Sequence, residues 1–148
     1  MPFRFPLEAV FHFRQSVEHQ HELRLRAANQ QVARVRHLVE VVDERIRQEQ
    51  LSHSRQIGAG TTAAEMHFAL MSEASLRQHR QDLDRELLRL QNLRDQQQKV
   101  FEQAHRERET FESLRTHQYR EHERDVTRRE QRRLDDLFLL RQAYLRRG

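Results

Sequence analysis

Cysteine and tryptophan are absent from this 148-residue chain, which also has only three glycines and two prolines. Without cysteine there is no disulfide, no thiolate metal site and no cysteine nucleophile. No apolar run approaches the ~20 residues of a membrane-spanning helix, since none is longer than that of residues 137–140. Pro6 and Glu8 stand where a signal peptide would have its apolar stretch. The sequence therefore predicts a soluble cytoplasmic protein without a membrane span.

Charge, by contrast, is abundant. Charged residues make up 34% of the chain and the mean hydropathy is -1.03. So few helix-breaking residues among so many Arg, Glu, Gln and Leu favour long helices. A helical rod needs burial along one stripe only, and regularly spaced Leu and Val distinguish such a rod from a disordered chain.

The first expected helix covers about residues 6–54, a span that begins with Pro6 and contains no glycine. Its apolar residues follow one another at alternating spacings of three and four, which is the heptad pattern of a coiled coil. They are Leu25, Ala28, Val32, Val35, Val39, Val42 and Ile46. Valine is a poor intrinsic helix former, so packing rather than propensity is expected to hold this helix.

A break follows at SRQIGAGTTAAE, and we expect a loop over about residues 55–61. Gly58 and Gly60 suit a helix end, while Thr62 with Glu65 fits the capping box that starts a helix. The second helix is expected over about residues 62–146. Its seam includes Leu83, Leu87 and Leu90, and further apolar residues follow at Phe101, Ala104, Phe111 and Leu114, but several of its heptad core positions hold arginine, as at Arg80, Arg94 and Arg108.

Two long helices joined by a short loop favour an antiparallel arrangement. The expected fold is therefore all-α, a single antiparallel two-helix coiled-coil hairpin over residues 1–148. With this loop, the numbers of paired residues should add to about 116. The phenylalanine-rich start would then lie beside Phe111 and Leu114 and close the open end of the hairpin. The residues of this anchor are Phe3, Phe5, Leu7, Phe11, Phe111 and Leu114.

The second helix would overhang the pair at the C-terminus. Residues 115–148 contain 10 Lys or Arg against 6 Asp or Glu, whereas residues 1–114 contain 17 of each. The whole net charge of +4 therefore lies in the C-terminal quarter, which is a candidate contact for an acidic partner.

Three features together resemble the FliJ family of flagellar export proteins: the opener FRFPLEAVFHFRQ, the two-glycine break, and the tract ERETFESLRTHQYREHERDVTRREQRRLDDL. The opener matches at Phe3, Arg4, Phe5, Leu7 and Val10, and the C-terminal signature at Glu130, Gln131, Leu134 and Asp135. The family commonly has Asp then Glu where this chain has Asp135 and Asp136. The C-terminal stretch LFLLRQAYLRR is more apolar than is usual for the family.

The resemblance implies a non-enzymatic antiparallel coiled coil, similar to the central stalk of rotary ATPases and seated in the ring of the flagellar export ATPase. Such proteins promote ring assembly, contact the cytoplasmic domain of the membrane export gate and bind export chaperones. The implied location is cytoplasmic, peripheral at the inner face of the cell membrane.

Two groups of residues are candidate partner-binding surfaces. Met66, Phe68 and Met71, beside Leu70, either cap the hairpin tip or dock on a partner, for which the export gate is the implied candidate. The second group consists of Arg128, Arg129, Arg132 and Arg133. Either these arginines lie on a helix that is simply frayed or dimerised, or, as the resemblance implies, they face acidic residues of the ATPase ring.

Other chemistry finds little support. The glycines lack the Lys and Ser or Thr of a phosphate-binding loop, and the ten histidines include no HExxH, so we expect no cofactor, metal site or catalysis. Nucleic-acid binding through RREQRRLDDL is the least favoured function, because Glu130, Asp135 and Asp136 repel phosphate. A virulence-type secretion stalk and a generic coiled-coil scaffold stay as alternatives.

Overall fold

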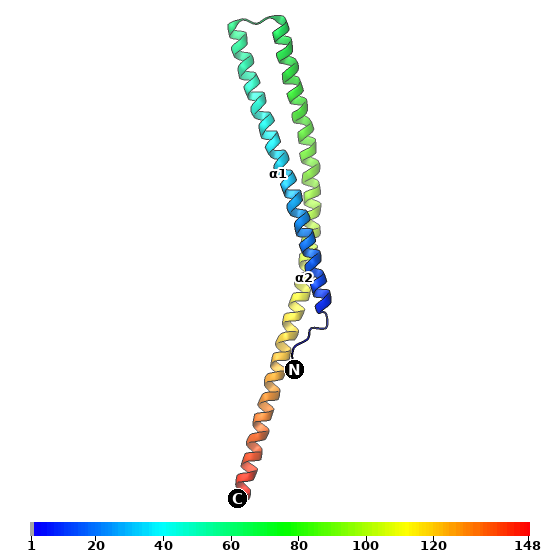
Figure 1. Ribbon diagram of the computed structural model, residues 1–148, viewed down its shortest axis with the longest axis vertical. Coiled ribbons are helices and arrows are strands. Elements are labelled where there is room, and N and C mark those ends of the chain that lie inside the picture. The colour runs from blue at the N-terminus through cyan, green and yellow to red at the C-terminus, as the bar shows by residue number, and fades with distance from the viewer. Residues whose placement is uncertain (1) are drawn as a thin grey trace. The chain divides into compact units, whose positions relative to one another are not determined.

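The computed structural model describes residues 2–148 and contains two α-helices, α1 (Glu8–Ala59) and α2 (Ala63–Arg147) (Figure 1). The helices pack against each other as a hairpin, and α2 is the longer, which confirms the predicted fold class. The chain divides into two compact units. We call residues 19–102 the turn unit, and the chain up to Glu18 together with Gln103 onward the terminal unit.

The turn between the helices is shorter than predicted. Residues 55–59, expected in the loop, are the last residues of α1, so only residues 60–62 are non-helical. Gly58 is tolerated inside the last helical turn, whereas Gly60 has a φ of 90° and ends the helix in the left-handed conformation that glycine adopts without strain. The hydroxyl of Thr61 donates to the carbonyl oxygen of Gln56 over 2.7 Å and ties the turn back to α1.

The predicted capping box at the start of α2 is present. The backbone N–H of Glu65 donates to the Thr62 hydroxyl over 3.2 Å, and the backbone N–H of Thr62 donates to the Glu65 carboxylate over 3.4 Å. At the other end of the chain α1 begins at Glu8, two residues later than predicted, and the Glu8 N–H donates to the carbonyl oxygen of Phe5 over 3.1 Å.

The pairing register also differs from the prediction, because the turn lies later in the chain than expected. The numbers of residues paired across the helices add to about 123, as for Asp43 with Arg80 in the turn unit and Glu8 with Arg115 in the terminal unit. A turn centred on Thr61 rather than on residue 58 raises this sum from the predicted value of about 116. The predicted register was therefore wrong by about seven.

The core of the turn unit is the predicted heptad seam. Val32, Val35 and Val42 of α1 are buried with Leu83 and Leu90 of α2. Val39, Ile46 and Leu87 pack against this cluster, and Leu25 is half-buried. Slim valines on one helix facing leucines on the other give complementary volumes along the seam.

The phenylalanine-rich start of the chain packs in the terminal unit, but closer to the C-terminus of α2 than predicted. The ring of Phe3 lies edge-on to Tyr119 at 5.2 Å and beside His122 at 5.6 Å, so its predicted place next to Phe111 and Leu114 was wrong. Phe5 is buried. The error follows from the register.

The other residues of the predicted anchor differ in burial. Phe11 is buried, and the guanidinium of Arg115 lies over its ring at 5.9 Å. Phe111 is half-buried, while Leu7 and Leu114 are both 37% exposed. The anchor therefore consists chiefly of Phe5 and Phe11, with Phe3 resting on Tyr119.

Beyond the N-terminal contacts, α2 continues as a single exposed helix. Every residue from Thr127 to Gly148 is exposed, and we call the helical part, residues 127–147, the overhang. Within residues 2–148, no helix has the length and apolar character needed to cross a membrane.

Candidate functional site

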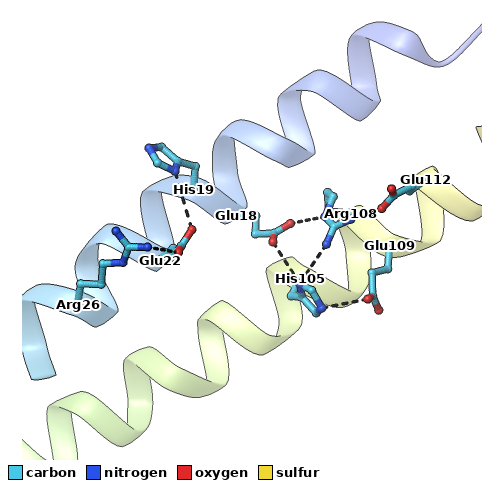
Figure 2. Close-up of polar contacts among 8 residues, drawn as sticks. All are labelled: Glu18, His19, Glu22, Arg26, His105, Arg108, Glu109 and Glu112. Atoms are coloured by element: carbon cyan, nitrogen blue, oxygen red, sulfur yellow. Dashed lines mark hydrogen bonds and ion pairs between the residues drawn. The ribbon is translucent and has the colours of Figure 1, made fainter.

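The most connected polar site lies in the terminal unit, where α1 and α2 face each other (Figure 2). Glu18 of α1 accepts hydrogen bonds from the Nε of Arg108 and from the Nδ1 of His105, the second over 3.1 Å. The side chains of Glu18 and Arg108 are only 17% and 18% exposed, so this ion pair is shielded from solvent on most sides. Glu18 thus joins two residues of the opposite helix.

Two further acids of α2 complete the network. Glu112 pairs with the Nη1 of Arg108, and Glu109 lies 3.0 Å from the Nε2 of His105. The Nη2 of Arg108 also lies 3.2 Å from the Nδ1 of His105. Figure 2 shows the three carboxylates arranged around one guanidinium and one imidazole. The network has alternating charges and presents no nucleophile beside a base.

The network shifts the pKa values of Glu18 and Arg108. Partial burial alone would raise the pKa of Glu18, but hydrogen bonds from Arg108 and His105, with the attraction of both groups, outweigh it and hold that pKa below its usual value. The Glu18 carboxylate in turn raises the pKa of Arg108. Both shifts favour the charged pair that spans the helices.

Two more ion pairs cross between the helices of the terminal unit. Arg14 Nη1 lies 2.6 Å from Glu107 Oε2, and Arg115 Nε lies 3.0 Å from Glu8 Oε2. Glu8, Arg14 and Glu18 therefore present alternating charges on α1, matched by opposite charges on α2. Such a pattern fixes register, since a shift along the helix would bring like charges together.

The turn unit contains a similar polar contact between the helices, again centred on an arginine. Arg80 of α2 donates from Nε to Asp43 of α1 over 2.6 Å and also pairs with Asp84. The hydrogen bond to Asp43 raises the pKa of Arg80. His21 and Gln97 are also joined across the helices, over 3.1 Å.

The sequence alone did not reveal Asp43 and Glu18 as the acidic partners of these two arginines. Arg80 and Arg108 stood out because they occupy heptad positions that are normally apolar, but Asp43 and Glu18 carried no comparable signal. A search for acids opposite the core arginines finds them only with the observed register. With the predicted register, Arg80 falls opposite residue 36, which is another arginine.

The predicted surface near the turn is exposed but not continuous. Phe68 is 76% exposed and Met71 59% exposed, and at 100° per residue they lie within about 60° of each other on α2. Met66 is 38% exposed and lies about 140° or more from both. Phe68 also lines a shallow groove with His53 and Gln56 of α1. The structure therefore brings Phe68 and Met71 to one face and leaves Met66 off it.

The four predicted arginines of the overhang are all exposed. Arg128 and Arg132 lie about 40° apart around the helix, as do Arg129 and Arg133, so the four cover one broad face of about 140°. The nearest acid to Arg128 is Asp125, with Nη1 and Oδ1 3.9 Å apart. These arginines are thus accessible to an acidic partner.

Comparison with known protein families identifies this chain's family. The model of the FliJ family, described as Flagellar FliJ protein, matches residues 3–148. No curated protein and no solved structure matches the chain.

Proposed function

The chain belongs to the FliJ family of flagellar proteins, and from this premise we propose that it is a non-enzymatic stalk that promotes assembly of the flagellar export ATPase ring and couples the ring to the export gate and to chaperones. Family membership makes the chain a coiled-coil structural component of the flagellar export apparatus. The finer role, as a stalk with named contacts, is what we propose here.

The overhang is the observation that carries this proposal. An exposed helix that continues past its partner helix has the form of an axle, because its whole circumference is free to contact surrounding subunits. Its net charge is strongly positive: residues 127–148 contain seven arginines against three acidic residues. A ring whose central channel carries carboxylates would therefore attract this end of the molecule.

Arg128, Arg129, Arg132 and Arg133 are the residues that we assign to the ring contact. Arginine stays charged and forms forked hydrogen bonds with carboxylates. Since the four cover one broad face of the helix, neighbouring ring subunits on that side can each meet a guanidinium. The paired part of the hairpin then stays available for other partners.

The surface formed by Phe68 and Met71 is the proposed contact for the cytoplasmic domain of the export gate, and Met66, which lies off this face, is not part of it. Exposed Phe and Met adapt well to an apolar groove on a partner. Export chaperones would bind the paired helices, and the protein would act in the cytoplasm at the inner face of the cell membrane.

The decisive experiment measures the hydrolysis rate and oligomer size of the cognate export ATPase with and without this protein. The full chain is compared with a truncation after Val126, which keeps Phe3 with its partners Tyr119 and His122 and removes only the overhang. We expect the full chain to stimulate hydrolysis and favour the ring, and the truncation to do neither. Equal stimulation by the truncation would refute the role of the overhang.

A charge-reversal pair tests the arginines themselves. The double variant Arg128→Glu and Arg132→Glu should lose most of the stimulation. The matched control is Arg24→Glu with Arg34→Glu on α1, which makes the same charge change at exposed sites without an acid three or four residues away. If both double variants reduce stimulation equally, the effect comes from net charge and not from the overhang.

The gate contact is tested with Phe68→Ser and Met71→Ser in the full chain. Because both side chains are exposed, helicity measured by circular dichroism should hardly change, while binding to the gate domain should weaken by at least tenfold. Loss of helicity would instead show that these residues stabilise the hairpin tip.

A further inference from the structure

The end of the overhang carries an apolar face that the proposed ring contact does not use. Residues 134–147 are here termed the tail, and seven of its large side chains are between 60 and 79% exposed. At 100° per residue six of them fall within an arc of about 160°. They are Leu134, Leu137, Phe138, Leu140, Tyr144 and Leu145. This arc is much wider than the two-position seam of a coiled coil.

The opposite face of the same helix is basic. Arg128, Arg132 and Arg146 lie close to the direction opposite the centre of the apolar arc. Asp135 and Asp136 are also on the polar side, but arginines outnumber acids by seven to three over residues 127–148. The preceding 126 residues contain 20 basic and 20 acidic residues, so this helix end holds the entire net charge of +4.

We propose that the tail binds the surface of a membrane that contains anionic phospholipids, lying in the plane of the headgroups with its apolar arc toward the acyl chains. A wide apolar face with Phe, Leu and Tyr, on a helix whose opposite side carries arginines before and after that face, is the composition of interfacial helices. Anionic headgroups complement the charge. The tail has 14 residues, against the ~20 of a span, so it lies on the bilayer.

Two departures from perfect segregation are compatible with this placement. Arg141 falls inside the apolar arc, but its long aliphatic stem can follow the apolar face while the guanidinium reaches the headgroup level. Leu139, 60% exposed, lies on the polar side and makes no contribution to insertion. Neither changes the sign of the charge or the width of the arc.

A second copy of the chain is the less suitable occupant. A coiled-coil seam through Leu134 and Leu137 continues to Arg141, and the other seam, through Leu137, Leu140 and Tyr144, is bounded by Arg133 and Arg147. Neither seam gives more than about one heptad of apolar core positions. A parallel pair would also place the basic stretch of residues 128–133 of each copy beside the other. Anionic lipid satisfies both the arc and the arginines.

This inference goes beyond the proposed function and does not depend on it. Lipid binding can fail while the ATPase is still stimulated, and the reverse also holds. A tail seated in a ring is not at a bilayer, so the two contacts would be alternatives for the same helix end.

The absence of tryptophan gives a direct test. In the full-length protein, Tyr144→Trp places one fluorophore on the apolar arc, and Phe68→Trp places one at a similarly exposed site of the turn unit as the control. Vesicles of three parts phosphatidylcholine to one part phosphatidylglycerol should shift the emission of the Tyr144→Trp variant to shorter wavelength and reduce its quenching by acrylamide. The control variant should change little, as should either variant with pure phosphatidylcholine.

Variants of the tail then separate the two contributions to binding. Leu137→Ser with Leu140→Ser should weaken vesicle binding by at least tenfold, because both lie on the apolar arc, Leu137 near its centre and Leu140 at its edge. Arg146→Ala with Arg147→Ala should weaken binding roughly 30-fold, at about fivefold per arginine removed. All four residues are exposed, so circular dichroism should show an unchanged hairpin.

The outcomes that overturn the proposal are distinct. One is no spectral shift of the Tyr144→Trp variant with anionic vesicles at low salt. Another is a shift that appears without lipid, rises with protein concentration and accompanies a doubling of mass in analytical ultracentrifugation, which would assign the tail to a second copy. Equal binding by the Leu137→Ser, Leu140→Ser variant would leave only diffuse charge attraction and would also refute insertion.

Discussion

Replacing Glu18 and Arg108 singly and together should reveal a coupling between the helices that ordinary surface ion pairs lack. The variants are Glu18→Gln, Arg108→Leu and the double variant, compared by urea unfolding at neutral pH. Both side chains are less than one-fifth exposed, and Arg108 donates directly to the carboxylate. Hydrogen bonds to charged groups contribute about 1.5–3 kcal/mol when shielded, and partial exposure lowers this to about 1–2 kcal/mol of coupling.

The control is the pair of Glu22 and Arg26, which lies along α1 with the two side chains 38% and 68% exposed. Its coupling should be about 0.3–0.5 kcal/mol, as for other pairs four residues apart on a helix. A value for Glu18 and Arg108 no greater than that of the control would refute the argument that burial and cross-helix geometry strengthen the pair.

Acid provides a second check with a defined sign. The pKa of Glu18 is lowered in the folded state, so the carboxylate stabilises the fold above its unfolded pKa. This contribution is lost as pH falls through the lower folded pKa. The coupling should therefore be complete at pH 7 and should disappear in acid, once the pH is below the lowered pKa of Glu18. A coupling that persists unchanged in acid would contradict the assigned charge state.

Further substitutions test packing and backbone geometry by urea unfolding. Val32→Ala, at a side chain only 2% exposed, should cost about 1.5–3 kcal/mol, whereas Val41→Ala, half-exposed on the same helix, should change the stability by less than about 0.5 kcal/mol. Phe5→Ala should cost about 3 kcal/mol or more if the anchor closes the terminal unit. Gly60→Ala should destabilise the fold by about 1–2 kcal/mol. The cost comes from the positive φ alone, because a Cβ at this position meets nothing within 4 Å. Gly58→Ala, inside α1, should stabilise the fold by up to about 1 kcal/mol. Equal effects of the two glycine substitutions would refute the turn geometry.

The elements of the fold could be predicted from the sequence because they rest on local signals. The heptad spacing of Val32, Val35 and Val42 shows one face of a helix, and Thr62 with Glu65 marks where the next begins. The end of α1 was less visible. Gly58 resembles a helix terminator in sequence, but a glycine in a last turn costs only about 1 kcal/mol, and the continuing helix offsets it.

That small error had a large effect on the candidate sites. Moving the centre of the turn by three residues or slightly more changes the partner of every residue by six or seven positions. This relocated Phe3 from Phe111 to Tyr119 and concealed the partners of Arg80 and Arg108. Cross-helix contacts depend on register, whereas the apolar stripe does not, since a heptad seam shifted by seven residues still presents its apolar face. The partner surfaces depend on molecules outside the chain, so exposure and charge alone could indicate them.

The continuity of α2 has a consequence for how its exposed end becomes ordered. An isolated peptide of this length must first form a helical nucleus, which is the unfavourable step of the helix–coil transition. In the intact chain that nucleus is supplied by the preceding residues of α2, which pack against Phe3, Phe5 and Phe11. The overhang therefore needs only helix propagation, and small gains from contact with a partner can shift the whole segment between frayed and fully helical states. Cleaving α2 at its junction with the overhang would remove this advantage and should leave a peptide that is mostly coil.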